Sequence, residues 1–164
     1  MKTEGETTVK TYFPKNKALA EKGDDESQFK LGKIYGRGWL GVTKDYKQAI
    51  YWLEKAAQQG HVEAQSYLGR LYFCTVGFKE DCEQAFYWFE KAAVQGDSDA
   101  QFNLGYMYFN GKGVKRDYEQ AIYWTKKAMA QGHADAQHNL DAMYRKMPLT
   151  AQLAMALKGA FYNT

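Results

Sequence analysis

The sequence has no long apolar stretch, few cysteines and little net charge, and each shortage excludes a class of protein. No run reaches the roughly 18 consecutive apolar residues that a membrane-spanning helix needs. Two cysteines, Cys74 and Cys82, are too few for the disulfide framework of a small secreted domain. The formal charge is only +3, and the sequence lacks the clustered cations typical of nucleic-acid-binding proteins. We therefore expect neither a membrane span nor a nucleic-acid partner.

The sequence also lacks the patterns of an active site or a cofactor site. Its histidines, His61, His133 and His138, do not stand at recognised zinc-ligand spacings from the cysteines. The segment Gly-Lys-Gly-Val at 111–114 is too short for a phosphate-binding loop. Candidate carboxylates recur at regular intervals, which argues against one catalytic centre. We expect no enzyme activity, no metal and no cofactor.

The composition predicts an ordered, soluble domain. Hydrophobic residues make up 45% of the 164 residues, aromatic residues 16% and charged residues 25%, which is typical of a folded globular protein. The polar start, MKTEGETTVKTYF, lacks the apolar core of a secretory signal. We expect a cytoplasmic protein, or a periplasmic one if a signal peptide has been removed.

Internal repetition is the dominant feature of this sequence. Similar segments such as AQSYLGRLYF and AQFNLGYMYF begin at Ser27, Ala64, Ala100 and Ala136, with spacings of 37, 36 and 36 residues. A second block, exemplified by DYKQAIYWLEKAAQQG, begins at Asp45, Asp81 and Asp117. Periods of this length are typical of helical-repeat proteins.

Both blocks have the terminal residues of helices. The aspartate that opens the second block can accept hydrogen bonds from free backbone N–H groups. The glycine that closes it suits a left-handed helix cap, at Gly60, Gly96 and Gly132. Further glycines are predicted to form the turn inside each unit, at Gly36, Gly38, Gly41, Gly77, Gly111 and Gly113. Each unit therefore predicts one helical hairpin.

The phase of the apolar residues predicts how the hairpins pack. Trp52, Trp88 and Trp124 recur beside alanines on one side of the second helix, so we expect them in the core and not in a ligand-stacking ladder. His61 and His133 follow the closing glycine, where Asp24 and Asp97 stand in other copies, which indicates a place at the start of a helix. Cys82 replaces Tyr46 and Tyr118, which indicates a packed thiol. Cys74 and Cys82 flank one short turn and either stay reduced or pair.

The combined pattern A-x3-LG-x2-Y, G-x-GV-x2-D and A-x2-W-x3-AA-x2-G resembles the Sel-1-like repeat family, relatives of the tetratricopeptide repeats. One repeat matches it in register at Gly105, Tyr108, Gly111, Gly113, Val114, Asp117, Ala121, Trp124 and Gly132. The resemblance implies a right-handed α/α solenoid used as an adaptor or scaffold. Asp141 departs from the pattern, because it replaces the helix glycine in the fourth copy.

We predict one all-α domain over 1–164. It comprises an N-terminal partial repeat (1–26), repeats at 27–60, 61–96 and 97–132, the first helix of a fourth repeat (133–147), and a C-terminal cap helix (148–164). In the last helix the side predicted to pack is formed by Leu149, Leu153, Ala156, Leu157 and Ala160. Because Ala151, Ala154 and Met155 lie outside that side, self-association through this helix is an alternative to capping.

Specificity in a repeat array is expected where the copies differ but point in one direction. The third, sixth and tenth positions after the residue that opens each first helix lie within about 60° of one another. We predict that this row lines the concave face and binds a protein or peptide, through Lys30, Lys33, Arg37, Tyr67, Arg70, Asn103, Tyr106, Asn110 and Asn139. Trp39, in the enlarged turn GRGWLG, is either a further contact or packed locally. The alternative for the row is an ordinary solvated surface.

The predicted function is therefore protein–protein interaction, as an adaptor, a scaffold or a stoichiometric inhibitor. Two more specific alternatives are an immunity protein that neutralises a bacterial toxin or effector, and a homo-oligomeric structural protein.

Overall fold

The computed structural model describes residues 4–74 and 81–162, with side chains described over 11–73 and 81–158. Within those ranges every regular element is a helix, which confirms the all-α prediction. The helices are α1 (Glu4–Glu21), α2 (Asp25–Arg37), α3 (Tyr46–Gln58), α4 (Val62–Cys74), α5 (Cys82–Val94), α6 (Ser98–Asn110), α7 (Tyr118–Ala130), α8 (Ala136–Lys146) and α9 (Leu149–Tyr162). No helix in these ranges is long and apolar enough to cross a bilayer.

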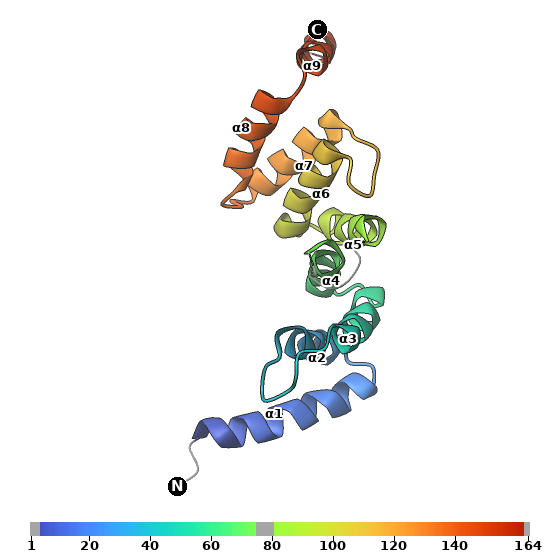
Figure 1. Ribbon diagram of the computed structural model, residues 1–164, viewed down its shortest axis with the longest axis vertical. Coiled ribbons are helices and arrows are strands. Elements are labelled where there is room, and N and C mark those ends of the chain that lie inside the picture. Colours follow the sequence, from blue (N-terminus) through green and yellow to red (C-terminus); the bar gives the residue numbers. More distant parts are fainter. Residues whose placement is uncertain (1–3, 75–80, 163–164) are drawn as a thin grey trace.

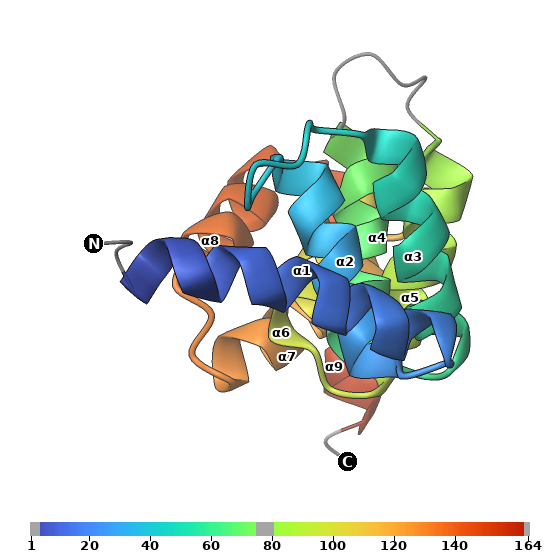
Figure 2. The same cartoon turned by 90° about the horizontal axis from the view of Figure 1, so that it is seen from below.

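The helices form a solenoid that runs from one end of the molecule to the other (Figure 1). The first helix of each hairpin, α2, α4 and α6, packs along the second, α3, α5 and α7. We call these the A helices and the B helices, and α8 is the A helix of the fourth unit. Helix α1 packs on α2 as α3 packs on α4, and it lies across the N-terminal end of the stack (Figure 2).

Local hydrogen bonds begin and end the B helices where the sequence predicts. The Asp45 carboxylate accepts from the backbone N–H groups of Lys47 and Gln48, at 2.9 and 3.1 Å. Asp81 and Asp117 begin α5 and α7 in the same way. The closing glycines have φ values of 93°, 102° and 81° at Gly60, Gly96 and Gly132. These caps are confirmed, and they set the length of each helix.

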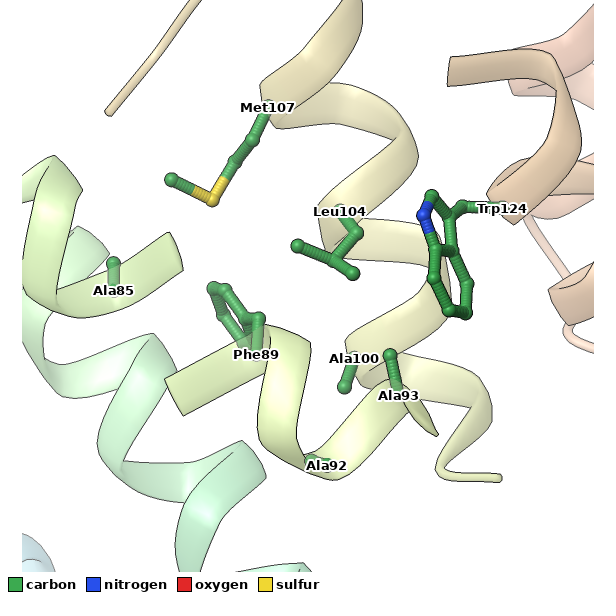
Figure 3. Packing of buried hydrophobic residues seen from close by; sticks show 8 residues of the cluster. All are labelled: Ala85, Phe89, Ala92, Ala93, Ala100, Leu104, Met107 and Trp124. Atoms are coloured by element: carbon green, nitrogen blue, oxygen red, sulfur yellow. The ribbon is translucent and has the colours of Figure 1, made fainter. Parts of the chain in front are cut away.

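The tryptophans join successive layers of the stack, as predicted. Trp52, Trp88 and Trp124 are 7%, 6% and 9% exposed. Figure 3 shows one layer, in which Phe89 of α5 faces Leu104 and Met107 of α6 while Trp124 enters from α7. Because each B-helix tryptophan packs on the preceding hairpin, the core is continuous along the solenoid.

A glycine inside each A helix lets the B helix approach closely. A Cβ added at Gly69 would lie 2.7 Å from the ring of Phe89, and one at Gly32 or Gly105 would overlap Leu53 or Thr125. In α8 the equivalent residue is Asp141, which is exposed and accepts from the Gln137 amide at 2.9 Å. Helix α9 does not pack along α8 as the B helices pack along α2, α4 and α6. A buried carboxylate at this position would be costly, so Asp141 is consistent with the absence of a B helix along α8.

A glutamine ladder, which the sequence analysis missed, connects neighbouring units. The buried Gln65 of α4 donates to the carbonyl of Ala57 at 3.0 Å and accepts from the Gln95 amide at 2.7 Å. The same two bonds recur at Gln28 and Gln101. The recurring Gln after the small residue of each A helix was the available signal. These bonds satisfy carbonyls in the last turn of the preceding B helix.

The prediction for the C-terminal helix is wrong about which side packs. Leu149, Leu153 and Leu157 are 67%, 56% and 62% exposed. Ala151 and Met155 instead pack against a cluster formed by Ile122, Leu140 and Met147. Both sides of α9 have helical apolar spacing, so the periodicity of the sequence did not distinguish them. The side chain of Ala160 lies outside the described residues.

Candidate protein-binding surface

The A helices bring the predicted contact residues to the protein surface. Arg37, Arg70, Tyr106 and Asn110 are exposed, and the others are partly buried. We call the set the A-helix row; it consists of Lys30, Lys33, Arg37, Tyr67, Arg70, Asn103, Tyr106, Asn110 and Asn139. None of them is fully buried, so all of them can reach a partner.

Two arginines and two aromatic rings meet where α2, its following turn and α4 come together. The Arg37 guanidinium lies 4.6 Å from the ring centroid of Trp39 and 6.0 Å from that of Tyr67. Arg70 lies 5.1 Å from the Tyr67 ring. Aromatic faces attract cations at such distances and restrict their motion. We call these four residues the arginine–aromatic cluster.

Gly36 makes room for Tyr67, which corrects its predicted role as a turn glycine. It lies inside α2 and is buried. A Cβ at Gly36 would lie 3.3 Å from the Tyr67 hydroxyl oxygen. Gly38, Gly41, Gly111 and Gly113 do have positive φ, as turns require. Gly77 lies outside the described residues.

Trp39 lies at the surface because the residue after it turns inward. Leu40 has a φ of 59°, and its side chain packs against the cluster that contains Leu31, Ile34 and Trp52. Trp39 is 49% exposed and stacks on Arg37. It is therefore available as a contact, and its role in binding stays a prediction.

A hollow of about 170 Å³ lies between α6 and α8, and three row residues line it: Tyr106, Asn110 and Asn139. Phe109, Ala142, Met143 and Lys146 complete its walls. It is smaller than the pockets that hold whole small-molecule ligands, and its size suits one side chain of a partner. The Asn139 side-chain nitrogen is buried and has no hydrogen-bond partner within the described part of the chain. The edge-on contact of Tyr106 with Phe73, at 5.9 Å, links the hollow to α4.

Two predicted contact residues, Asn103 and Asn110, also have local bonds. The Asn103 amide donates to the Asp99 carbonyl, and the Asn110 amide donates to the Tyr106 carbonyl, each at 2.8 Å. Their side-chain oxygens are acceptors that these bonds do not use. Both amides are therefore held in fixed positions along the row.

The B helices carry an exposed tyrosine row that the sequence analysis missed. Tyr51, Tyr87 and Tyr123 are 49%, 46% and 48% exposed. Each touches the following tryptophan edge-on, with centroids 4.9 to 5.1 Å apart. A lysine one turn later covers each ring, at Lys55, Lys91 and Lys127. The Tyr-Trp pair in all three copies was the signal. Because each tyrosine covers its tryptophan, the repetition has a structural reason.

The Glu26 carboxylate, in the first turn of α2, is bound by two neighbouring side chains. Glu26 lies 3.0 Å from the Lys30 ammonium and 3.1 Å from Nε2 of His61. The hydrogen bond from His61, followed by that from Lys30, holds the pKa of Glu26 below its ordinary value, and Glu26 in turn raises the pKa of Lys30. Glu63 of α4 lies 3.3 Å from Nδ1 of His61, but that nitrogen accepts from the backbone N–H of Ala64 and so does not donate to Glu63.

Tyr72 and Tyr108 are partly buried tyrosines at equivalent positions of successive units. The Tyr72 hydroxyl donates to Glu54 of α3 at 2.9 Å. Burial raises the pKa of Tyr72, and the hydrogen bond to Glu54 raises it further. Burial likewise raises the pKa of Tyr108. Glu54 therefore joins two hairpins.

The histidines lie at the starts of helices, as predicted for His61 and His133. Nδ1 of His61 accepts from the backbone N–H of Ala64, and Nδ1 of His133 accepts from that of Asp135, each at 3.3 Å. Among the residues with described side chains, no three His, Cys, Asp or Glu residues are grouped so that they could hold a metal ion. Cys82 is partly buried against the core, as predicted. The Cys74 side chain lies outside the described residues, so the pairing of the two cysteines stays a prediction.

Stacked helical hairpins with a variable row along their A helices define an α-solenoid repeat protein. The chain belongs to the Sel1 repeat family, because the Sel1 repeat model matches residues 25–61, 62–97 and 98–133. Sel1 repeat proteins generally mediate protein–protein interactions. Within the chain, the three matches correspond to the hairpins α2–α3, α4–α5 and α6–α7.

Solved structures share this fold. A protective antigen present in uropathogenic Escherichia coli strains, which displays an SLR fold, is 42% identical, with a TM-score of 0.75 over 80% of this chain and 28% of that one. A Sel1 repeat protein from Oxalobacter formigenes is 38% identical, with a TM-score of 0.69 over 78% of this chain and 96% of that one.

A curated relative is much longer than this chain. The ERAD-associated E3 ubiquitin-protein ligase component HRD3A of Arabidopsis thaliana is 32% identical over 53 residues, which are 32% of this chain and 8% of that protein. This chain thus spans less than a tenth of that relative and 28% of the Escherichia coli antigen.

Proposed function

We propose that the protein is a binding module that holds a partner protein or peptide along its A-helix row. The hollow between α6 and α8 supports this most directly, because it joins Tyr106, Asn110 and Asn139 from two units in one recess of side-chain size. The arginine–aromatic cluster supplies tyrosine, tryptophan and arginine, the residue types most frequent at binding hot spots. The proposed binding surface follows the row and extends to Trp39.

The test compares two row variants with a control on the opposite helices. Tyr67→Ala/Arg70→Ala removes the cluster, Tyr106→Ala/Asn139→Ala changes the hollow, and Lys55→Gln/Lys127→Gln removes two exposed B-helix charges. Each protein is immobilised and exposed to a lysate of the native host. A partner that the wild type and the control retain and the row variants lose is then purified and titrated by calorimetry.

Each row variant is expected to bind the purified partner about tenfold or more weakly than the wild type does, since truncating a hot-spot residue costs at least about 1–2 kcal/mol of binding free energy. The circular dichroism spectrum should stay near that of the wild type, whereas the thermal midpoint of the Tyr67→Ala/Arg70→Ala variant should fall because Tyr67 packs against the core cluster that contains Leu53 and Leu68. Equal affinity of all four proteins for the partner would show that the row is an ordinary solvated surface.

The same titration separates the more specific functions. A tight one-to-one complex that inactivates a toxic enzyme supports the immunity or inhibitor function. Several weaker partners that bind together support an adaptor or scaffold. The solvated alternative predicts none of these complexes.

Self-association is a second candidate function, favoured by the exposed leucines of α9. Leu149, Leu153 and Leu157 follow one another at four-residue spacing, so they form one apolar stripe on the helix surface. Leu153→Gln/Leu157→Gln should convert an oligomer into a monomer in analytical ultracentrifugation without changing the helix content. A wild-type protein that is already monomeric at high concentration contradicts this candidate.

A further inference from the structure

The cations of the arginine–aromatic cluster have no carboxylate partner in the part of the chain whose side chains are described. Arg37 and Arg70 contact only the rings of Trp39 and Tyr67 among the interactions found over residues 11–73 and 81–158, and neither takes part in an ion pair there. Lys33, one turn before Arg37, lies over the Phe29 ring at 5.0 Å. This end of the A-helix row therefore presents positive charge that no carboxylate among the described side chains neutralises.

The carboxylates of the same two helices lie at their other ends. Glu26, in the first turn of α2, is bound to Lys30 and His61, and Glu63 lies in the first turn of α4. Arg37 is the last residue of α2, so about 16 Å of helix separates it from Glu26 at the usual rise per residue. The acidic residues of α2 and α4 therefore lie at the start of each helix, and Arg37 and Arg70, which have no ion-pair partner among the described residues, lie toward the other end.

The aromatic rings prepare the guanidinium groups for a ligand. A free arginine side chain loses much rotational freedom when it binds, but stacking on Trp39 and Tyr67 has already restricted Arg37 and Arg70. A guanidinium group donates two parallel hydrogen bonds to a carboxylate, which gives both strength and direction. Trp39, half exposed beside Arg37, offers an apolar surface next to the charges.

We infer that the arginine–aromatic cluster binds an acidic segment of the partner protein, in which Asp or Glu carboxylates pair with Arg37 and Arg70 and a neighbouring apolar side chain lies on Trp39. The inference rests on the proposed function and names the chemistry of the partner at one end of the row.

The extent of the positive charge favours a short acidic segment over a nucleic acid. The cations of the row lie on α2 and α4, and the row continues on α6 with the uncharged Asn103, Tyr106 and Asn110. A nucleic-acid backbone has a negative charge at every nucleotide and is bound by longer basic stripes. A segment with a few carboxylates matches the small basic region that the structure shows.

The test uses the intact protein and short fluorescein-labelled synthetic peptides. One peptide alternates Glu and Tyr, and the second has Gln in place of every Glu. Fluorescence anisotropy should show that the protein binds the Glu peptide at least about tenfold more tightly than the Gln peptide, and that raising the salt from about 50 to about 300 mM weakens binding. Equal affinity for the two peptides overturns the inference.

Matched variants locate the binding. Arg37→Gln/Arg70→Gln should lose about tenfold or more of the affinity for the Glu peptide. The control Lys55→Gln/Lys127→Gln removes the same charge from cations that also lie over tyrosine rings, and it should keep nearly all of the affinity. Circular dichroism checks that both variants are folded. An equal loss in the two variants overturns the inference, because net charge alone would then explain binding.

A single-stranded oligouridylate tests whether the cluster instead binds nucleic acid. If it binds more tightly than the Glu peptide and depends on Arg37 and Arg70, the ligand is nucleic acid and the inference is wrong. If the Glu peptide does not bind but Tyr106→Ala/Asn139→Ala still releases the natural partner, the inference fails and the proposed function stands. If the natural partner binds every row variant as tightly as the wild type, the proposed function fails, whether or not the Glu peptide binds.

Discussion

Replacing Gly69 by alanine should destabilise the solenoid, because α4 and α5 meet at this residue. The new Cβ would lie 2.7 and 2.8 Å from two ring carbons of Phe89. Phe89 is fully buried, and Ala85, Leu104 and Met107 are members of the same cluster. The ring has no free space to move into, since protein cores are close-packed.

The expected loss follows from two opposing effects. One extra methyl group in a well-packed core costs about 1–3 kcal/mol. Alanine is favoured over glycine inside a helix by about 1 kcal/mol. We therefore expect the free energy of unfolding to fall by up to about 2 kcal/mol.

Urea unfolding, followed by circular dichroism, measures this change in a double-mutant cycle with Phe89→Leu. In the Phe89→Leu background, which lacks the ring, Gly69→Ala should cost at least about 1 kcal/mol less than in the wild type. Asp141→Ala is the matched control, because Asp141 holds the same place in α8 without a B helix against it. It should change stability by no more than about 0.5 kcal/mol.

A neutral or stabilising Gly69→Ala without coupling to residue 89 would refute the reasoning. That result would mean that the A and B helices are farther apart than the structure shows.

Two further predictions concern buried polar groups. Gln65→Ala should lower the free energy of unfolding by about 1–3 kcal/mol because it removes the two hydrogen bonds that the buried Gln65 makes, to the Ala57 carbonyl and from the Gln95 amide. Gln137→Ala, at the equivalent but exposed position of α8, should change it by less than about 0.5 kcal/mol; equal effects in urea unfolding would contradict the ladder. Because the pKa values of Tyr72 and Tyr108 are raised, the folded protein keeps protons that the unfolded chain loses at high pH. The free energy of unfolding should therefore keep its full value below about pH 10 and fall as the pH rises above it. Tyr72→Phe/Tyr108→Phe should flatten that decline in urea titrations from about pH 9 to about pH 11, and an unchanged slope would assign it to other groups.

Much of the fold could be predicted because its signals act within one or two helical turns. Asp45, Asp81 and Asp117 bind backbone N–H groups two or three residues away, and glycines such as Gly60 end helices through their own φ angle. The phase of a residue such as Trp88 along its helix follows from the 3.6-residue period alone. The row was predictable for the same reason, as a set of positions on one side of each A helix.

Contacts between units could not be predicted in this way. Arg37 and Arg70 share the Tyr67 ring because α2 and α4 stack at a particular distance, and Gly36 allows it by lacking a Cβ. The hollow beside Asn139 likewise depends on how α6 and α8 diverge.

The sequence by itself therefore determined the repeat, the helix ends and the residues that face inward, because these depend on hydrogen bonds and periodicity within each helix. Only the tertiary structure decided which side of α9 packs, where the stack ends, and which row residues touch. Those outcomes depend on the distances and angles between helices. Side chains from several units jointly determine these distances and angles. Leu153 and Met155 illustrate the difference, because both have helical spacing but only Met155 meets a neighbouring apolar surface.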